Sequence, residues 1–339
     1  MKKWFFLAFL ANGCSWTRRA GTDAILLTRG QSVALLTNLF AVHKDQRDLP
    51  LVFLPRAGCL GVAVMIEDRS YIAIVDTGSP FLTTPPDFVS VTTDASTLYP
   101  STPEQYGEAF GEIQWRRADD VDLGLAMRAR ELIVGVVAES LVEASGGLYL
   151  GLLYADDNRP TFLNQCQLDS FSIDYEDRKL RLFKGGDIFS NTTPAWPMFD
   201  LTQFGPNVYH YGVLCDSLSF QIESPQRERR SVRLTDTKRP IVVVIDTGLT
   251  GCILSDSFSE EIGDLPLESI TGASIELEPD GTALESDPKY WYLSSFCLPW
   301  FPDDSDHPHI LAAGATFLNG SRLVVDARRR LMQLQPKAT

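Results

Sequence analysis

The segment IAIVDTG at residues 72–78 occurs again, as VVVIDTG, at residues 242–248. In both copies four apolar residues lead into an Asp-Thr-Gly tripeptide, and the two aspartates, Asp76 and Asp246, lie 170 residues apart. That separation is about the length of one domain. An internal repeat of this kind predicts a chain built from two halves of the same design.

The repeat extends beyond the two tripeptides. Tyr149-Leu150-Gly151 follows the first copy and Ala312-Ala313-Gly314 follows the second, so an apolar pair ending in glycine recurs. After each glycine come an apolar segment ending in Asp, a basic turn and another apolar segment, at residues 171–183 and 323–334. One Asp-Thr-Gly turn arises easily by chance, whereas matched features at matched distances do not.

From about residue 50 onward the pattern is overwhelmingly β. Short apolar or alternating runs are separated by clusters of Gly, Pro, Asp and Asn, which is typical of strands joined by turns. The clearest runs are Gly61–Ile66, Tyr71–Val75, Leu132–Val137, Phe171–Tyr175, Leu180–Phe183 and Val213–Ile222. One short helix is expected at Asp256–Ile262. The predicted fold class is all-β (mainly β), with the linker between the halves at residues 184–197.

Composition limits the classes of partner. The 339 residues include 30 Lys and Arg against 44 Asp and Glu, for a net charge of −14. Such an acidic surface repels phosphate backbones, so no nucleic-acid partner is expected. No stretch approaches the ~18 apolar residues of a membrane helix, so no stable membrane insertion is expected. Only four histidines occur, and no metal site is expected; His307-Pro308-His309 is interpreted as part of a solvated loop.

The N-terminus has the layout of a secretory signal peptide at residues 1–13, with Lys2 and Lys3 before a short apolar run. A buried strand or helix is the alternative. Residues 14–49 form a possible pro-segment or an N-terminal lead-in. Asn191 and Asn319 begin glycosylation tripeptides, which favours a secreted protein or one in an endomembrane or vacuolar lumen.

Six cysteines are spaced without any CxxC pair, so neither a zinc site nor a thioredoxin-like site is indicated. One or two disulfide bonds are compatible with a secretory route, and Cys252 with Cys297 is one pairing to consider. The sequence does not determine the pairing.

The two Asp-Thr-Gly segments suggest a specific chemistry. Glycine permits a turn that a Cβ would obstruct and leaves backbone N–H groups free to reach the carboxylate. The hydroxyls of Thr77 and Thr247 could hydrogen-bond between the halves and hold the turns together. Asp76 and Asp246 would then share one proton, because two like charges that close do not both ionise cheaply. One carboxyl becomes a base and the other an acid. A duplicated but inert scaffold is the alternative.

Residues 50–335 resemble the pepsin-like aspartic proteases. The resemblance rests on residues 74–79, 244–248, 310–318 and 323–326. It implies a bilobal fold with two similar β-rich lobes, at residues 50–186 and 195–339, and an active-site cleft between them. It also implies that Asp76 and Asp246 are catalytic and activate a water that hydrolyses extended polypeptides, without a cofactor. The active-site turns would comprise Thr77, Gly78, Ser79, Thr247 and Gly248.

The family covers its cleft with a β-hairpin flap that carries a Tyr beside a Gly. Tyr106-Gly107 is the matching pair and is expected to bind substrate; a surface loop is the alternative. Residues 110–115 and 121–125 would form the strands that return from this flap.

Three features differ from the family pattern. Ser79 follows the first glycine and its hydroxyl could favour ionised Asp76, whereas Leu249 follows the second and cannot do the same for Asp246. The Trp that the family often places after the first turn is missing, and Trp115 is the candidate to pack there. The stretches from each turn to the later glycine, 75 and 68 residues, are short for the family.

We therefore expect a monomeric aspartic endopeptidase that acts on polypeptide substrates. A pepsin-fold binding or inhibitory protein without catalytic activity is the alternative from another class. A weaker alternative is an intracellular member of the family whose N-terminus is not a signal.

Overall fold

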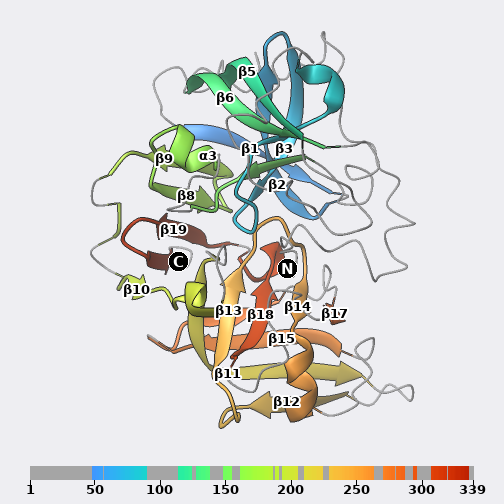
Figure 1. Cartoon of the computed structure of the whole chain (residues 1–339). Coiled ribbons are helices and arrows are strands. Elements are labelled where there is room, and N and C mark those ends of the chain that lie inside the picture. Colours follow the sequence, from blue (N-terminus) through green and yellow to red (C-terminus); the bar gives the residue numbers. More distant parts are fainter. Residues whose placement is uncertain are drawn as a thin grey trace.

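The computed structural model describes residues 48–55, 57–89, 114–123, 127–137, 148–154, 161–185, 188–190, 193–204, 210–223, 229–262, 270–278, 280–286, 293–295, 307–318 and 320–335. Over these residues the protein is mainly β and forms two sheets, with short helices between strands. Figure 1 shows β1, β2, β3, β5 and β6 of the larger sheet in the upper part of the molecule and the smaller sheet in the lower part, with β8 and β19 of the larger sheet at an intermediate height.

The larger sheet has twelve strands and includes the first Asp-Thr-Gly segment. Its strands are β1 (Asp48–Leu54), β2 (Cys59–Ile66), β3 (Arg69–Asp76), β4 (Thr83–Thr84), β5 (Gln114–Asp122), β6 (Arg128–Val136), β7 (Leu148–Gly151), β8 (Ser170–Asp174), β9 (Lys179–Phe183), β10 (Trp196–Pro197), β19 (Arg322–Asp326) and β20 (Leu331–Gln335).

The smaller sheet has eight strands and leads into the second Asp-Thr-Gly segment. Its strands are β11 (Gly212–Glu223), β12 (Arg229–Leu234), β13 (Ile241–Ile245), β14 (Cys252–Leu254), β15 (Ile270–Leu277), β16 (Ala283–Glu285), β17 (Leu293–Ser295) and β18 (His309–Ala313). The helical elements of the described chain are η1 (Pro86–Phe88), α3 (Phe162–Gln165), η3 (Leu201–Phe204), η4 (Asp256–Phe258), α4 (Ser259–Ile262) and η7 (Ala315–Phe317).

The final part of each repeat forms a hairpin, and the two hairpins lie side by side in the larger sheet. β8 pairs antiparallel with β9, β19 pairs antiparallel with β20, and β8 also pairs with β19. The turn of each hairpin ends in an arginine with positive φ, Arg178 at 51° and Arg330 at 53°. The last strands of the chain therefore join the sheet that contains Asp76.

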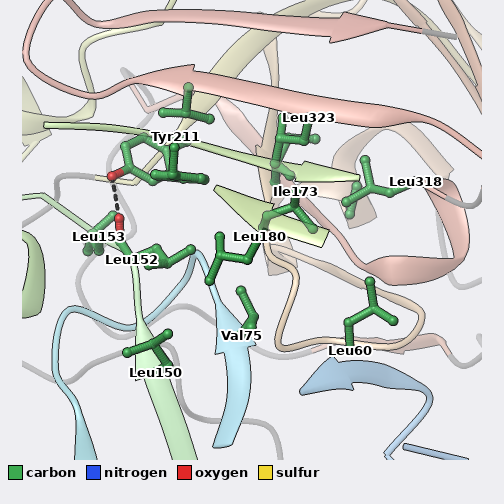
Figure 2. Packing of buried hydrophobic residues seen from close by; sticks show 14 of the residues in the cluster. Leu60, Val75, Leu150, Leu152, Leu153, Ile173, Leu180, Tyr211, Leu318 and Leu323 are labelled. Atoms are coloured by element: carbon green, nitrogen blue, oxygen red, sulfur yellow. Dashed lines mark hydrogen bonds between the residues drawn. The ribbon is translucent and has the colours of Figure 1, made fainter. Parts of the chain in front are cut away.

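One continuous hydrophobic cluster includes buried residues from both sheets. Figure 2 shows Ile173, Leu180 and Leu323 of the paired hairpins packed close to Val75, the residue before the first aspartate. Burial of apolar surface contributes about 25 cal/mol per Å². This shared core therefore holds the carboxyl end of β3 in a fixed position.

The expected strands and the expected helix at residues 256–262 are confirmed. Two other expectations are wrong. Trp115 and Val121 belong to one continuous strand, β5, whose partner is β6, so they do not lie on separate returning strands. Cys252 is a free, buried thiol, so the structure does not form the disulfide considered above; Cys297 lies outside the described residues.

Candidate functional site

The two Asp-Thr-Gly segments occupy equivalent places in the two sheets. Asp76 is the last residue of β3, and Asp246 directly follows β13. Each of these strands runs parallel to a neighbour, β7 in the larger sheet and β18 in the smaller one. Because the strand ends are buried on both sides, the two carboxyls are held by rigid backbone rather than by mobile loops.

Four hydrogen bonds tie the two turns to each other. The backbone N–H of Thr77 donates to the hydroxyl of Thr247 at 3.1 Å, and the N–H of Thr247 donates to the hydroxyl of Thr77 at 3.0 Å. Each hydroxyl then donates across the interface at 2.7 Å, Thr77 to the carbonyl of Ile245 and Thr247 to that of Val75. Both threonines are buried, so the predicted contact between the turns is present and reciprocal.

The glycines of the turns allow the two carboxyls to approach. A Cβ added to Gly78 would lie 2.6 Å from Oδ2 of Asp246, and one added to Gly248 would lie 2.5 Å from Cγ of Asp76. Each glycine also donates its N–H to Oδ1 of the aspartate in its own turn, at 2.7 Å for Gly78 and 3.0 Å for Gly248. A side chain at either position would therefore occupy the space of the opposite carboxyl.

The later glycines of the repeat brace the same two turns. Gly151 donates its N–H to Phe81 at 2.9 Å, and Gly314 donates to Gly251 at 2.7 Å. A Cβ on either of these glycines would lie 2.4 Å from a backbone atom of the turn it supports. The matched apolar-apolar-Gly segments thus have the same structural role in both halves.

The two carboxyls have raised and unequal pKa values, because both are buried and because the charge of one affects the other. Both are only 3% exposed and they hydrogen-bond to each other. Burial raises the pKa of Asp76 to about 6, opposed by N–H groups of the turns. The pKa of Asp246 is raised further, by burial and then by the negative charge of Asp76. Asp76 therefore ionises first, and Asp246 keeps the shared proton.

The residue after each turn glycine acts on the carboxyls through its backbone. The N–H of Ser79 lowers the pKa of Asp76 and the N–H of Leu249 lowers that of Asp246, both against the larger effect of burial. The absence of a hydroxyl at Leu249 therefore does not leave the second turn without a donor at this position. The order of ionisation follows mainly from burial and mutual repulsion.

Thr250, the residue after Leu249, forms a hydrogen bond with backbone outside the second turn. Its hydroxyl donates to the carbonyl of Ala57, in the turn that joins β1 and β2. The thiol of Cys59, from the same region, lies 3.4 Å from the carbonyl of Gly248. The region that joins β1 and β2 of the larger sheet therefore contacts and supports the second Asp-Thr-Gly segment.

Trp115 takes up the position suggested by the sequence. Its ring packs edge-on against Phe81, shortly after the first turn, with centroids 4.7 Å apart and an interplanar angle of 75°. Its buried Nε1 has no hydrogen-bond partner in the described part of the chain. The flap candidates Tyr106 and Gly107 lie outside the described residues.

Several other predictions also fall outside the described residues. These are the signal peptide, nearly all of the possible pro-segment, and the glycosylation candidates Asn191 and Asn319. Within the described ranges, no group of three or more His, Cys, Asp or Glu side chains is placed to hold a metal ion. No helix among these residues is long and apolar enough to cross a membrane.

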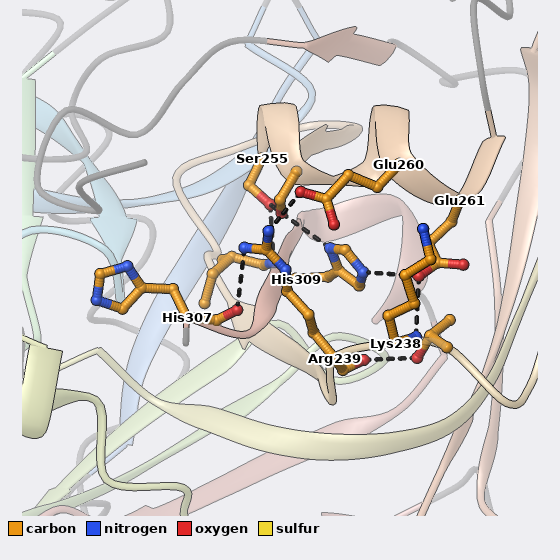
Figure 3. Close-up of polar contacts among 10 residues, drawn as sticks. Lys238, Arg239, Ser255, Glu260, Glu261, His307 and His309 are labelled. Carbon is orange, nitrogen blue, oxygen red and sulfur yellow. Dashed lines mark hydrogen bonds and ion pairs between the residues drawn. The ribbon is translucent and has the colours of Figure 1, made fainter. Parts of the chain in front are cut away.

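A second polar cluster surrounds His309 and is shown in Figure 3. Nδ1 of His309 lies 2.9 Å from the hydroxyl of Ser257, and Nε2 lies 3.4 Å from Oε1 of Glu261. The ring stacks on Phe258 with centroids 4.8 Å apart. Burial lowers the pKa of His309, and the hydrogen bond that its ring donates to Glu261 opposes this shift.

The interpretation of His309 as a loop residue is wrong. It begins β18 and is fully buried, because the chain continues directly into the apolar run at residues 310–313. This apolar run is the sequence feature from which a buried strand beginning at His309 could have been predicted. The contact of His309 with Glu261 attaches α4 to β18.

Comparison of the sequence with known proteins gave no relative: no family model matches the chain, and no curated protein matches it. The geometry of the two turns therefore carries the functional interpretation.

Proposed function

We propose that the chain is an aspartic endopeptidase with a pepsin-like bilobal fold, in which Asp76 and Asp246 form the catalytic pair. The observation that supports this most strongly is the reciprocal contact of two equivalent turns around two buried, hydrogen-bonded carboxyls. Burying two carboxyls side by side costs stability. A scaffold without a use for the pair has no reason to keep that arrangement.

The proposed reaction begins with a water held between the carboxyls. Ionised Asp76 accepts a proton from this water while the water oxygen attacks the carbonyl carbon of the peptide. Asp246 donates its proton to the carbonyl oxygen, which gives a neutral gem-diol and no covalent enzyme intermediate. Asp76 then protonates the amide nitrogen, a diol hydroxyl returns a proton to Asp246, and the C–N bond breaks. Both carboxyls regain their starting states.

The environment of the pair favours these roles. The base must be ionised and the acid protonated at the same pH, and the raised, unequal pKa values of Asp76 and Asp246 provide that combination. N–H groups from Gly78 and Gly248 hold the carboxyls in place throughout the cycle. The fixed dipoles require little reorganisation as charge moves between the two groups.

The substrate in this proposal is an extended polypeptide in a cleft between the two sheets, covered by a flap at Tyr106-Gly107. The compartment is the secretory pathway or an endomembrane lumen, reached through a signal peptide at residues 1–13. Sensitivity of the purified protein to a glycosidase, lost on replacement of Asn191 and Asn319, would test the compartment independently of activity.

The proposed activity is tested with the full-length protein and an unfolded protein as substrate, from about pH 3 to 9, a range that extends to both sides of the Asp76 pKa of about 6. Cleavage that pepstatin, a general inhibitor of the resembled family, blocks is the expected result. Folded protein that cleaves nothing at any pH would contradict the proposal and favour the binding or inhibitory alternative.

A further inference from the structure

Tyr211 lies between the two halves of the repeat, just before β11, and is 2% exposed. Its phenol oxygen donates to the carbonyl of Leu152 at 2.6 Å and accepts the N–H of Tyr154 at 2.9 Å. Figure 2 shows the Tyr211 ring reaching across to the segment of Leu152 and Leu153, which follows β7. A residue beside the smaller sheet is thus bonded to backbone that continues from the larger one.

Backbone hydrogen bonds connect both Leu152 and Tyr211 to the two segments that carry the candidate catalytic aspartates. The N–H of Leu152 donates to the carbonyl of Asp76 at 2.8 Å. At the other end the N–H of Ile245, the residue before Asp246, donates to the carbonyl of Tyr211 at 3.0 Å. A chain of hydrogen bonds therefore runs from the backbone of Asp76 through Leu152 and Tyr211 to the strand end that carries Asp246.

The buried surroundings make this link rigid. Leu152 is fully buried, so its carbonyl has no access to water if the phenol is removed. Burial also raises the pKa of Tyr211 well above its ordinary value. The phenol consequently remains neutral, as both donor and acceptor, over the whole pH range in which the aspartates titrate.

We propose that Tyr211 is a positioning residue for the peptide hydrolysis proposed above: it fixes the distance between the two carboxyls through Leu152 and Ile245. The inference rests on the proposed function. The Thr77 and Thr247 contacts hold the tips of the turns, whereas Tyr211 holds the strand ends behind them. Loss of the phenol would loosen the carboxyl pair without removing any group that touches substrate.

The alternative is that Tyr211 is an ordinary core tyrosine, and Tyr71 provides a matched control. Tyr71 is also buried, at 1% exposure, and its phenol donates to the carbonyl of Thr83 at 2.7 Å. Both ends of that bond belong to the larger sheet. Replacement of either tyrosine by phenylalanine removes a buried phenol, but only one of them connects the two turns.

The experiment compares wild type, Tyr211→Phe and Tyr71→Phe as full-length proteins. For each, kcat and KM are measured against pH, and the titration of the Asp76 and Asp246 carboxyls is followed by ¹³C NMR, with assignment from Asp76→Asn. Tyr211→Phe is expected to lower kcat about tenfold with KM within a factor of two, and to bring the two carboxyl titrations closer together. Tyr71→Phe is expected to leave kcat and both titrations unchanged.

Equal titrations and equal kcat in the two variants would overturn the inference, whatever their thermal stabilities. If wild type cleaves no substrate, the proposed function fails, and the NMR titration still decides whether Tyr211 controls the carboxyl pair. If Tyr211→Phe does not fold, 3-fluorotyrosine at position 211 keeps the ring shape and changes the acidity of the phenol. The inference is supported if the carboxyl titrations change when 3-fluorotyrosine is placed at position 211 but not when it is placed at position 71. It is overturned if neither replacement changes them.

Discussion

Thr77 and Thr247 exchange hydrogen bonds in both directions, each accepting the other's backbone N–H and donating to the residue before the opposite aspartate. The four bonds relate the two turns by a local two-fold symmetry. Removal of one hydroxyl breaks one accepted and one donated bond, and the groups left behind are buried. The two carboxyls depend on this contact for their relative position.

Thr247→Val should therefore reduce both stability and activity. Loss of the hydroxyl leaves the N–H of Thr77 and the carbonyl of Val75 without their partner, at a cost of about 1–3 kcal/mol for each buried group. We expect the free energy of unfolding, measured by urea denaturation, to fall by roughly 2–4 kcal/mol. The rate of peptide cleavage should fall by more than the fraction unfolded explains.

Two further variants control this prediction. Thr247→Ser keeps the hydroxyl and should retain most of the stability and activity. Thr316→Val removes a buried hydroxyl that has no hydrogen-bond partner among the described residues, and it should be neutral or slightly stabilising. Similar losses in Thr247→Val and Thr316→Val would contradict the role given to the contact between the turns.

Gly78→Ala tests the close approach of the two halves. The new methyl group would lie 2.6 Å from Oδ2 of Asp246, so the turn or the carboxyl must move. We expect cleavage to fall at least about a hundredfold, because displacement of about 1 Å at a reacting group costs that much. Gly272→Ala, where the nearest atom would be 3.4 Å away, is the control. Normal activity in Gly78→Ala would show that the carboxyls are not packed as described.

The pH profile of kcat/KM should be bell-shaped. Asp76 must be ionised to act as base, so activity should fall as the pH drops through its pKa of about 6. Asp246 must be protonated, so activity should fall again as the pH rises through its higher pKa. Leu249→Ser could add a donor to ionised Asp246 and should move the alkaline limb to lower pH, relative to Leu249→Ala. Identical alkaline limbs in these two variants would refute this account.

His309 should make the fold less stable in acid. Burial holds its pKa below the ordinary 6.5, opposed by Glu261, so the unfolded chain binds the proton more readily. The free energy of unfolding should thus decrease as the pH falls below about 6.5, by at most about 1.4 kcal/mol for each unit of pKa difference. His309→Gln removes this titration. Denaturation of both proteins at pH 5 and 7.5 should show a smaller pH effect in the variant, and parallel curves would argue against it.

The sequence predicted the features that depend on local pattern. Alternating apolar runs gave the strands, and the repeated Asp-Thr-Gly segments with their later glycines gave the two braced turns. The contact between Thr77 and Thr247 was predictable because the repeat itself implies a symmetric partner. Local pattern and duplication together therefore defined most of the candidate site.

Contacts between distant segments could not be predicted in this way. His309 is buried by Ser257, Phe258 and Glu261, whose proximity depends on how α4 packs on β18. Nothing in the sequence distinguishes Tyr211 from other aromatic residues that precede a strand. Its hydrogen bonds with Leu152 and Tyr154 depend on how the two sheets pack against each other. Contacts of this kind leave no periodic pattern in the sequence, because only the three-dimensional packing determines which residues become partners.

The measurement that tests the central claim most directly is cleavage of an unfolded protein by wild type, Asp76→Asn, Asp246→Asn and Asp326→Asn. Asp326 is also a buried aspartate at a strand end, 4% exposed, but it pairs with Arg329 away from the two turns. We predict that both changes at the pair reduce cleavage by at least about 1000-fold with the fold intact, and that folded Asp326→Asn stays within a few-fold of wild type. Undiminished cleavage by folded Asp76→Asn would contradict the assignment of the catalytic pair.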